Sequence, residues 1–165
     1  MSLGFYRGSG VRGMDIKFMK AALKEAQKSF EQDEVPVGCV IVKDGTIIAR
    51  AHNKREESQA ATAHAEILAI NKACGKLKSF RLEGCDLYVT LEPCPMCAGA
   101  VINARVRNVV FAAFDPKAGC CGTLYNLPSD KRFNHRAAVT GGVLEEESKK
   151  LLQEFFRRKR QPLLD

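Results

Sequence analysis

The chain has 165 residues, of which 45% are hydrophobic and 27% are charged, a composition typical of one soluble globular domain with a sizeable core. No apolar run approaches the roughly 20 residues of a membrane span, and the first residues lack the apolar block of a signal peptide. We therefore expect a cytoplasmic protein without membrane contact. The formal net charge of +7 is compatible with a phosphate-rich partner but does not identify one.

The beginning of the chain has no regular apolar pattern. We interpret residues 1–13 as a tag or a disordered extension, and residues 14–165 as a single domain. From Asp15 to about Gln32, apolar residues recur at the spacing of one helix face, with Asp15 as a candidate cap. This segment predicts an amphipathic helix.

A hairpin and a second helix are predicted next. Residues 36–51 read PVGCVIVKDGTIIARA and predict two strands joined by Asp44-Gly45, because these residues tolerate the positive φ angles of a tight turn. Residues 52–62 form a polar loop. A helix is predicted from Ala63 to about Ala73, with Thr62 as a candidate cap and Gly75 near its end.

The second half of the chain alternates strands and helices. Residues 86–92 and 106–114 predict buried strands, with a helix between them that starts just after Pro93. After a long connection, residues 137–143 predict a short edge strand and residues 144–160 a final helix. Strands joined through helices form parallel pairs with helices on both faces. The order therefore predicts an α/β fold, a three-layer α/β/α sandwich with a mixed central sheet.

Two cysteines open the helix after Pro93. Cys94 and Cys97 are three residues apart, so in a first helical turn their side chains share one face. The helix N-terminus stabilises thiolates, the form that zinc binds. A redox pair or two buried thiols would give the same spacing. Seven cysteines, an odd number, and the lack of export features favour a metal site over a disulfide framework.

His64 opens the other helix that is expected to start at this end of the sheet, where α/β proteins place their sites. A structural zinc site has four protein ligands, whereas a catalytic site keeps one position for water. His64, Cys94 and Cys97 supply three protein ligands. A fourth ligand stays open from the sequence, and the candidates for it are His52, Cys74 and Cys85.

Glu66 favours chemistry at the metal. A carboxylate close to a metal-activated water can take up its proton and pass it on. Residues two apart lie on nearly opposite faces of an ideal helix, so His64 and Glu66 can both face a metal only if the first turn is irregular. The alternative is an acid that stabilises the helix dipole.

The motifs resemble a known family. His64-Ala65-Glu66 with Pro93-Cys94-Pro95-Met96-Cys97 resembles the signature of the zinc-dependent cytidine/deoxycytidylate deaminase superfamily. From Asp15 to about Gln161 the chain is similar to bacterial tRNA-specific adenosine deaminases. The resemblance implies a cytidine deaminase-like homodimer that converts the wobble adenosine of an arginine tRNA anticodon to inosine. Its motifs are VPVGCVIV, HN at residues 52–53, TAHAEILAI, TLEPCPMCAGAV, FDPKAGCCG, FNHR and FFRRKR.

The resemblance also implies roles for individual residues. His64, Cys94 and Cys97 hold one Zn²⁺ per subunit, and Glu66 is the proton shuttle. Cys120-Cys121 has a packing role. The residues that contact the nucleoside or form the base pocket are Asn53, Val35, Pro36, Ala65, Leu91, Glu92 and Pro93. The residues near the tRNA anticodon stem-loop are Asp115, Lys117, Asn134, His135, Arg136, Phe156 and Arg157.

Two other functions use the same motifs. A deaminase of cytosine, guanine or a free nucleotide would have the same zinc core. A non-catalytic nucleic-acid-binding protein would have a structural zinc, and a fourth protein ligand would favour it. The basic cluster at residues 157–160, after Phe155-Phe156, favours RNA, although cations at a helix end also complement the helix dipole.

Overall fold

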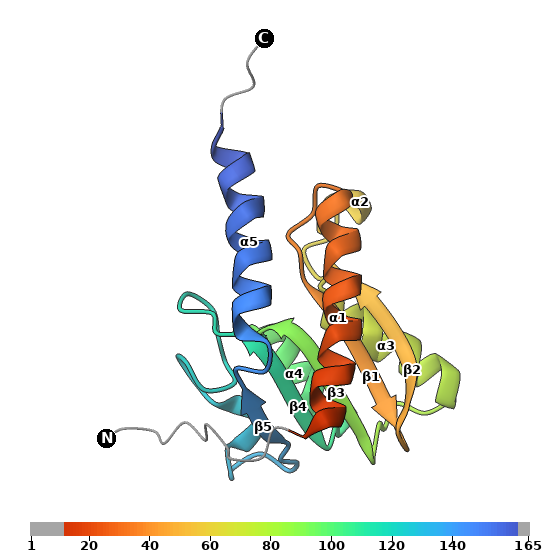
Figure 1. Cartoon of the computed structure of the whole chain (residues 1–165). Helices are drawn as coiled ribbons and strands as arrows, with labels where there is room; N and C mark the ends of the chain where they lie inside the picture. The colour runs from red at the N-terminus through yellow and green to blue at the C-terminus, as the bar shows by residue number, and fades with distance from the viewer. Residues whose placement is uncertain (1–11, 162–165) are drawn as a thin grey trace.

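The computed structural model describes residues 12–161, and in it five strands form one mixed sheet with the order β2-β1-β3-β4-β5. β1 is antiparallel to β2 and β3, whereas β4 and β5 run parallel to β3. Helices cover both faces of the sheet (Figure 1). The predicted three-layer sandwich with a mixed sheet is thereby confirmed. The strands are β1 (Gly38–Lys43), β2 (Thr46–His52), β3 (Cys85–Leu91), β4 (Asn108–Ala113) and β5 (Ala138–Gly141).

Two hydrophobic cores hold the layers together. Helices α1 (Gly13–Glu31) and α5 (Glu145–Arg160) lie on one face, where Met19 packs in a cluster with Tyr88. Helices α3 (Ala65–Leu77) and α4 (Pro95–Ala104) lie on the other face, over a second cluster that includes Val89 and Val101. Apolar residues at helical spacing on these helices meet the alternate residues of the strands. This burial supplies the main driving force for the fold.

The predicted hairpin is confirmed. Asp44 and Gly45 connect β1 to β2 with φ angles of 49° and 73°, the left-handed values that a two-residue turn requires. The short edge strand and the last helix also lie where the sequence predicts them, as β5 and α5. No described helix has both the length and the hydropathy that a membrane span requires.

The first helix begins earlier than the pattern predicts. α1 starts at Gly13, and Asp15 lies inside its first turn, where its carboxylate accepts a hydrogen bond from the Arg12 backbone N–H at 3.1 Å. The prediction that Asp15 precedes the helix as its cap is wrong for that reason. Residues 1–13 were interpreted as a tag or extension, and residues 1–11 of this segment lie outside the described residues.

The boundaries of α3 also differ from the prediction. The helix begins at Ala65 rather than Ala63, so the cap position belongs to His64 and not to Thr62. It continues through Gly75 and ends at Leu77, with Lys78 in a left-handed conformation at φ 51°. The preceding polar loop contains a short helix, α2 (Arg55–Ser58), and a single 3₁₀ turn, η1 (Leu127–Ser129), interrupts the long connection after β4.

Candidate metal centre and active site

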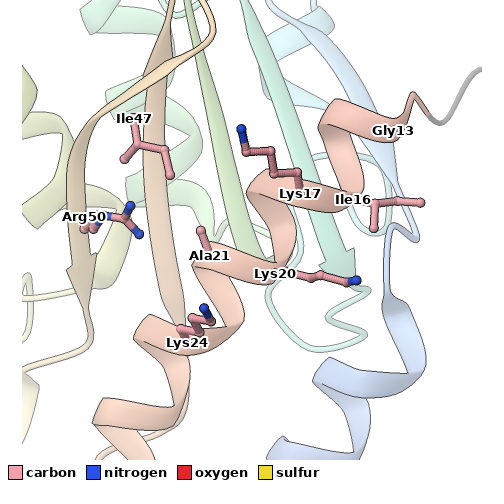
Figure 2. A pocket seen from close by; sticks show the side chains of 8 residues that line it. All are labelled: Gly13, Ile16, Lys17, Lys20, Ala21, Lys24, Ile47 and Arg50. Carbon is pink, nitrogen blue, oxygen red and sulfur yellow. The ribbon is translucent and has the colours of Figure 1, made fainter.

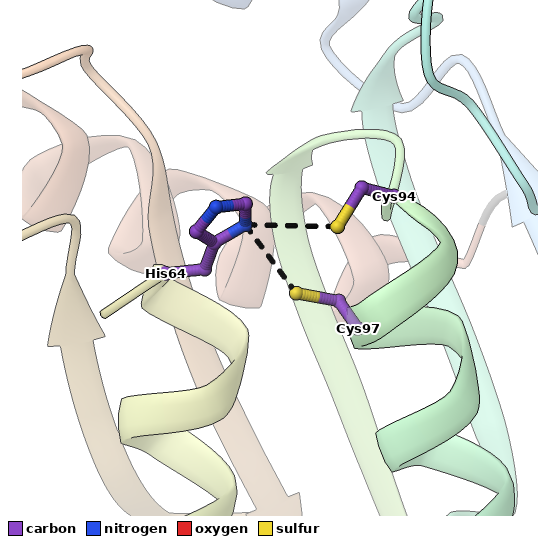
Figure 3. A group of neighbouring side chains, drawn as sticks. All are labelled: His64, Cys94 and Cys97. Atoms are coloured by element: carbon purple, nitrogen blue, oxygen red, sulfur yellow. Dashed lines mark hydrogen bonds between the residues drawn. The ribbon is translucent and has the colours of Figure 1, made fainter. Parts of the chain in front are cut away.

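The three predicted metal ligands meet at one end of the sheet. α3 and α4 both begin at this end, because β3 and the loop before α3 both lead the chain to it. His64 and Cys94 occupy the cap positions of α3 and α4, and Cys97 lies in the first turn of α4. Figure 3 shows the three side chains facing one another across the gap between the two helix starts.

The distances fit a tetrahedral zinc ion. His64 Nδ1 lies 3.7 Å from Cys94 Sγ and 3.6 Å from Cys97 Sγ. Zinc bonds of about 2.3 Å to sulfur and about 2.0–2.1 Å to nitrogen, at tetrahedral angles, separate the two atoms by about 3.6 Å. All the described cysteines are free thiols. One nitrogen and two sulfurs are therefore already arranged as a zinc-binding donor set.

The protonation of the two cysteines supports this arrangement. The hydrogen bond from the Cys97 thiol, together with that from His64, outweighs burial and lowers the pKa of Cys94 to about 4. The same hydrogen bond raises the pKa of Cys97. The lowered pKa of Cys94 favours its thiolate form, and the Cys97 thiol gives up its proton when a cation binds, as is general for cysteine ligands.

No fourth protein ligand joins the group within residues 12–161. The ring of His52 is engaged elsewhere, with Nδ1 3.2 Å from Glu25 and Nε2 3.3 Å from Gln32. Cys74 lies toward the C-terminal end of α3 and Cys85 begins β3, so both are away from the helix starts. The three candidates for a fourth ligand therefore do not close the site, and the donor set is that of a catalytic metal centre.

Glu66 lies beside the three ligands, and the first turn of α3 explains how. His64 has φ −75° and ψ 149°, an extended conformation outside the helix, while Glu66 is the second helical residue. The bend at the cap lets both side chains reach the same cavity. Glu66 is only 4% exposed, and burial raises its pKa. A buried carboxyl group with a raised pKa is suited to carrying a proton near neutral pH.

A cavity of about 380 Å³ opens beside the group of three ligands, of which His64 and Cys94 line it, and its volume is within the usual range for small-molecule sites. Asn53 helps to shape it, since its Oδ1 accepts a hydrogen bond from the Ala65 backbone N–H at 2.8 Å and so positions the start of α3. The predicted residues that line the cavity, besides His64, Cys94 and Glu66, are Val35, Asn53, Leu91, Glu92, Asp115 and Phe156.

Three residues in the cavity wall were not predicted from the sequence: Val37, Arg55 and Ala118. Arg55 offered a signal, because it is a cation two residues after the predicted nucleoside contact Asn53. Val37 and Ala118 carry no such signal. They enter the wall because the segment before β1 and the loop after β4 fold over the same end of the sheet.

Other predicted residues lie outside the cavity wall. Pro36, Ala65 and Pro93 are next to residues of the wall, and Lys117 is exposed in the turn that follows Asp115. His135 Nε2 lies 2.7 Å from the Val106 carbonyl oxygen, just before β4. Residues 134–136 therefore lie at the opposite end of the sheet from the cavity.

Arg157 is exposed on α5 and pairs with Glu154, with Nη2 2.6 Å from Oε1. Contacts of Arg157 and residues 134–136 with RNA stay predictions.

The carboxylate of Glu92 connects the metal-binding turn to the loop after β4. It is 2% exposed and accepts hydrogen bonds from the backbone N–H groups of Asp115, Cys121 and Thr123 at 3.0–3.1 Å, and from the Thr123 hydroxyl. A Cβ at Gly119 would approach this carboxylate to 2.4 Å and would displace it. Glu92 therefore holds the cavity wall at Asp115 in place.

Glu92→Gln should destabilise the fold. The amide keeps the shape of the side chain but replaces one acceptor oxygen with a donor that faces backbone N–H groups, and each buried donor left unsatisfied costs about 1–3 kcal/mol. We expect the free energy of unfolding, measured in urea, to fall by that amount. Gly119→Ala should act in the same direction, whereas Glu83→Gln, at an exposed position, should have no effect. Equal stability of wild type and Glu92→Gln would contradict this role.

Relatives with the same architecture identify the class of protein. The family described as MafB19-like deaminase matches residues 14–160. The fold and the His-Cys-Cys site with its adjacent glutamate thus define a deaminase.

The closer relatives specify the family. A tRNA-specific adenosine deaminase of Bacillus subtilis (strain 168) is 61% identical over 143 residues, which cover 87% of this chain and 89% of the relative. The tRNA-specific adenosine deaminase of Aquifex aeolicus (strain VF5) is 48% identical over 147 residues, which cover 89% of this chain and 97% of the relative. The chain belongs to the tRNA-specific adenosine deaminase family.

Solved structures agree with this assignment. A chain from biochemical and structural studies of A-to-I editing by tRNA:A34 deaminases at the wobble position of transfer RNA superposes with a TM-score of 0.79 at 46% identity. The match covers 82% of this chain and 99% of that one. Guanine deaminase of Nitrosomonas europaea superposes with a TM-score of 0.75 at 28% identity. The match covers 85% of this chain and 83% of that one. The same fold thus occurs in a deaminase of a free base.

Proposed function

We propose that this protein hydrolyses the 6-amino group of adenosine to give inosine at the wobble position of a tRNA anticodon, with an arginine tRNA as substrate. The observation that carries the proposal is the cavity that joins the His64, Cys94 and Cys97 group to Glu66, in a chain 61% identical to a tRNA-specific adenosine deaminase. We also propose that residues 14–165 form the single catalytic domain and that the enzyme works in the cytoplasm.

The metal is proposed to be one Zn²⁺ per subunit, held by His64, Cys94 and Cys97. A neutral imidazole and two thiolates match its ligand preferences and cancel its charge. When bound, zinc lowers the pKa of a water molecule so that hydroxide is available at neutral pH. His64 and Cys94 line the cavity that a base would enter, which supports this role for the metal.

Glu66 is proposed to move the protons of the reaction. Its carboxylate takes the proton of the attacking water and donates it to N1 of the adenine ring. It then takes the proton of the hydroxyl group that has added to C6 and delivers it to N6, which leaves as ammonia while C6 becomes a carbonyl carbon. Burial favours the protonated carboxyl group and so supports this exchange. Asn53 lines the cavity and would orient the nucleoside, while Val35 and Leu91 offer apolar walls to the ring faces.

The mouth of the cavity suits a base that has left its stack. Phe156 is 44% exposed and lines the cavity, whereas the neighbouring Phe155 is buried against Phe30, with ring centroids 6.3 Å apart. Single-stranded loops can turn bases outward, and aromatic rings at a protein surface stack on such bases. The pair Phe155-Phe156 therefore combines a core contact with a surface available to RNA.

The basic end of α5 should contribute to RNA affinity. Residues 157–160 are exposed, and in the described part of the chain Arg157, Arg158 and Lys159 share two acidic partners, Glu154 and Asp33. Replacing the four cations with glutamine should weaken tRNA binding and reduce the salt dependence of log K by up to about 3, since each phosphate contact contributes about 0.7–0.9. Filter binding at several salt concentrations measures this. An unchanged slope would mean that the four cations only complete the helix end.

The direct test offers several substrates to zinc-loaded protein. An anticodon stem-loop of arginine tRNA with a wobble adenosine is compared with free adenosine, cytidine and guanine, and inosine and released ammonia are measured. Inosine in the RNA alone is the expected result. Turnover of a free base or nucleoside alone would move the protein to the small-substrate deaminases, which share its fold in the guanine deaminase of Nitrosomonas europaea.

A homodimer is proposed from the surface of α4. Met96, Gly99 and Ala100 are only partly covered in the monomer, and nothing lies within 4 Å of a Cβ built on Gly99. Leu124 and Tyr125 add exposed apolar area on the loop after β4. Small residues allow a second subunit to approach closely, so Gly99→Arg should halve the mass measured by sedimentation equilibrium. A wild-type protein that sediments as a monomer would refute the proposal.

A further inference from the structure

A groove of about 490 Å³ lies between α1 and the edge strand β2, and none of its residues lines the metal cavity (Figure 2). Its floor includes Ala21 and Ile47, and none of the described residues that line it is acidic. Four cationic side chains surround the groove, Lys17, Lys20, Lys24 and Arg50. The groove is therefore a concentrated positive surface, separate from the proposed catalytic centre.

The backbone of both elements brings these cations together. The three lysines are at positions i, i+3 and i+7 of α1, so they share one helix face and span about 10 Å along its axis. In β2, Ala49 pairs with Ile41 but Ile47 pairs with Val42, so Ile48 is an extra residue in the ladder. This bulge lets Ile47 and Arg50, three residues apart, line the same groove, whereas a regular strand would turn them to opposite faces.

Within residues 12–161, carboxylates do not neutralise the four charges. Among the described residues, none of the four cations forms an ion pair with a carboxylate. Lys28, one turn further along α1, does pair with Glu25 at 2.8 Å. Uncompensated cations hold counterions in solution, and a polyanion that displaces those ions gains free energy. The groove therefore favours a ligand with several closely spaced negative charges.

We propose that this groove binds the phosphate backbone of the substrate RNA, in the stem that carries the loop with the target adenosine. The inference rests on the proposed function. Val35 and Val37, which follow the C-terminal end of α1, line the metal cavity, so an RNA arm that lies along α1 would reach both sites. The beginning of the chain does not complement the groove, because residues 1–12 contain two arginines and no acidic residue.

The test removes the three lysines together. Lys17, Lys20 and Lys24 are exposed, so the variant with glutamine at all three positions is expected to fold. For tRNA, the slope of log K against log salt should fall by about 2–3, and KM should rise about tenfold, with kcat unchanged. The control replaces Lys76, Lys78 and Lys150 with glutamine, which removes the same charge from exposed positions outside the groove. This control should keep the wild-type salt slope and KM.

Each outcome has a separate meaning. Equal slopes and KM values in the two triple variants and the wild type would overturn the inference. So would a groove variant that binds tRNA normally but no longer sediments with phosphatidylserine vesicles, because the groove would then recognise a membrane surface. A wild-type enzyme that leaves the wobble adenosine of tRNA unchanged would instead overturn the proposed function, whatever the groove binds.

Discussion

Glu66→Gln should bind zinc like the wild type and lose deamination by about 10²–10⁴-fold, the usual contribution of general acid–base catalysis. The amide has the volume of the carboxyl group but cannot accept a proton from water or carry one to N1 and N6 of the base. Metal content by mass spectrometry and the single-turnover rate on a stem-loop RNA measure the two effects. Glu66 is not one of the three grouped ligands, so the metal content should not change.

A matched control separates this role from a helix-dipole effect. Glu147 is likewise an acid in the first turn of a helix, but it is exposed on α5 and does not line the cavity. If Glu66 only stabilised the helix dipole, Glu66→Gln and Glu147→Gln would each lower the free energy of unfolding by roughly 0.3–1 kcal/mol and leave turnover intact. A Glu66→Gln enzyme with wild-type turnover would remove the proton-transfer role.

Removing the metal should abolish activity without unfolding the chain. His64, Cys94 and Cys97 lie at helix starts. They are not members of the two hydrophobic clusters that hold the sheet and helices together. After chelation we expect the circular dichroism spectrum to persist, deamination to fall to background, and stoichiometric Zn²⁺ to restore it. The melting temperature should fall modestly, since a ligand that binds only the folded state stabilises it by mass action.

Two cysteine variants sharpen this experiment. Cys94→Ser should lose both zinc and activity, because a hydroxyl is a poor substitute for a thiolate ligand. Cys74→Ser changes a cysteine that the sequence left open as a fourth ligand but that lies outside the group of three. It should keep zinc at one ion per subunit and retain turnover. Unfolding of the wild type on chelation, or zinc loss in Cys74→Ser, would indicate a closed structural site.

Local patterns predicted much of the architecture. The alternation in residues 36–51 with Asp44-Gly45 predicted the hairpin, and the one-face spacing in α1 and α5 predicted those helices within a few residues. Helix ends were less predictable. Thr62 is a better intrinsic cap than His64, yet α3 starts after His64 and uses Asn53 to satisfy the Ala65 N–H. A side chain twelve residues away thus replaced the local cap.

From the amino-acid sequence alone, His64, Cys94 and Cys97 were predicted to form one group with Glu66 beside it, and the structure brings these residues together. His64 with Glu66, and Cys94 with Cys97, each lie within one helical turn, so short spacings carry that information. Only the tertiary structure decided the cavity wall, the position of residues 134–136 and the groove beside α1. These depend on how distant loops and strands meet, and Glu92 shows the reason: its carboxylate is satisfied by a loop more than twenty residues further along the chain.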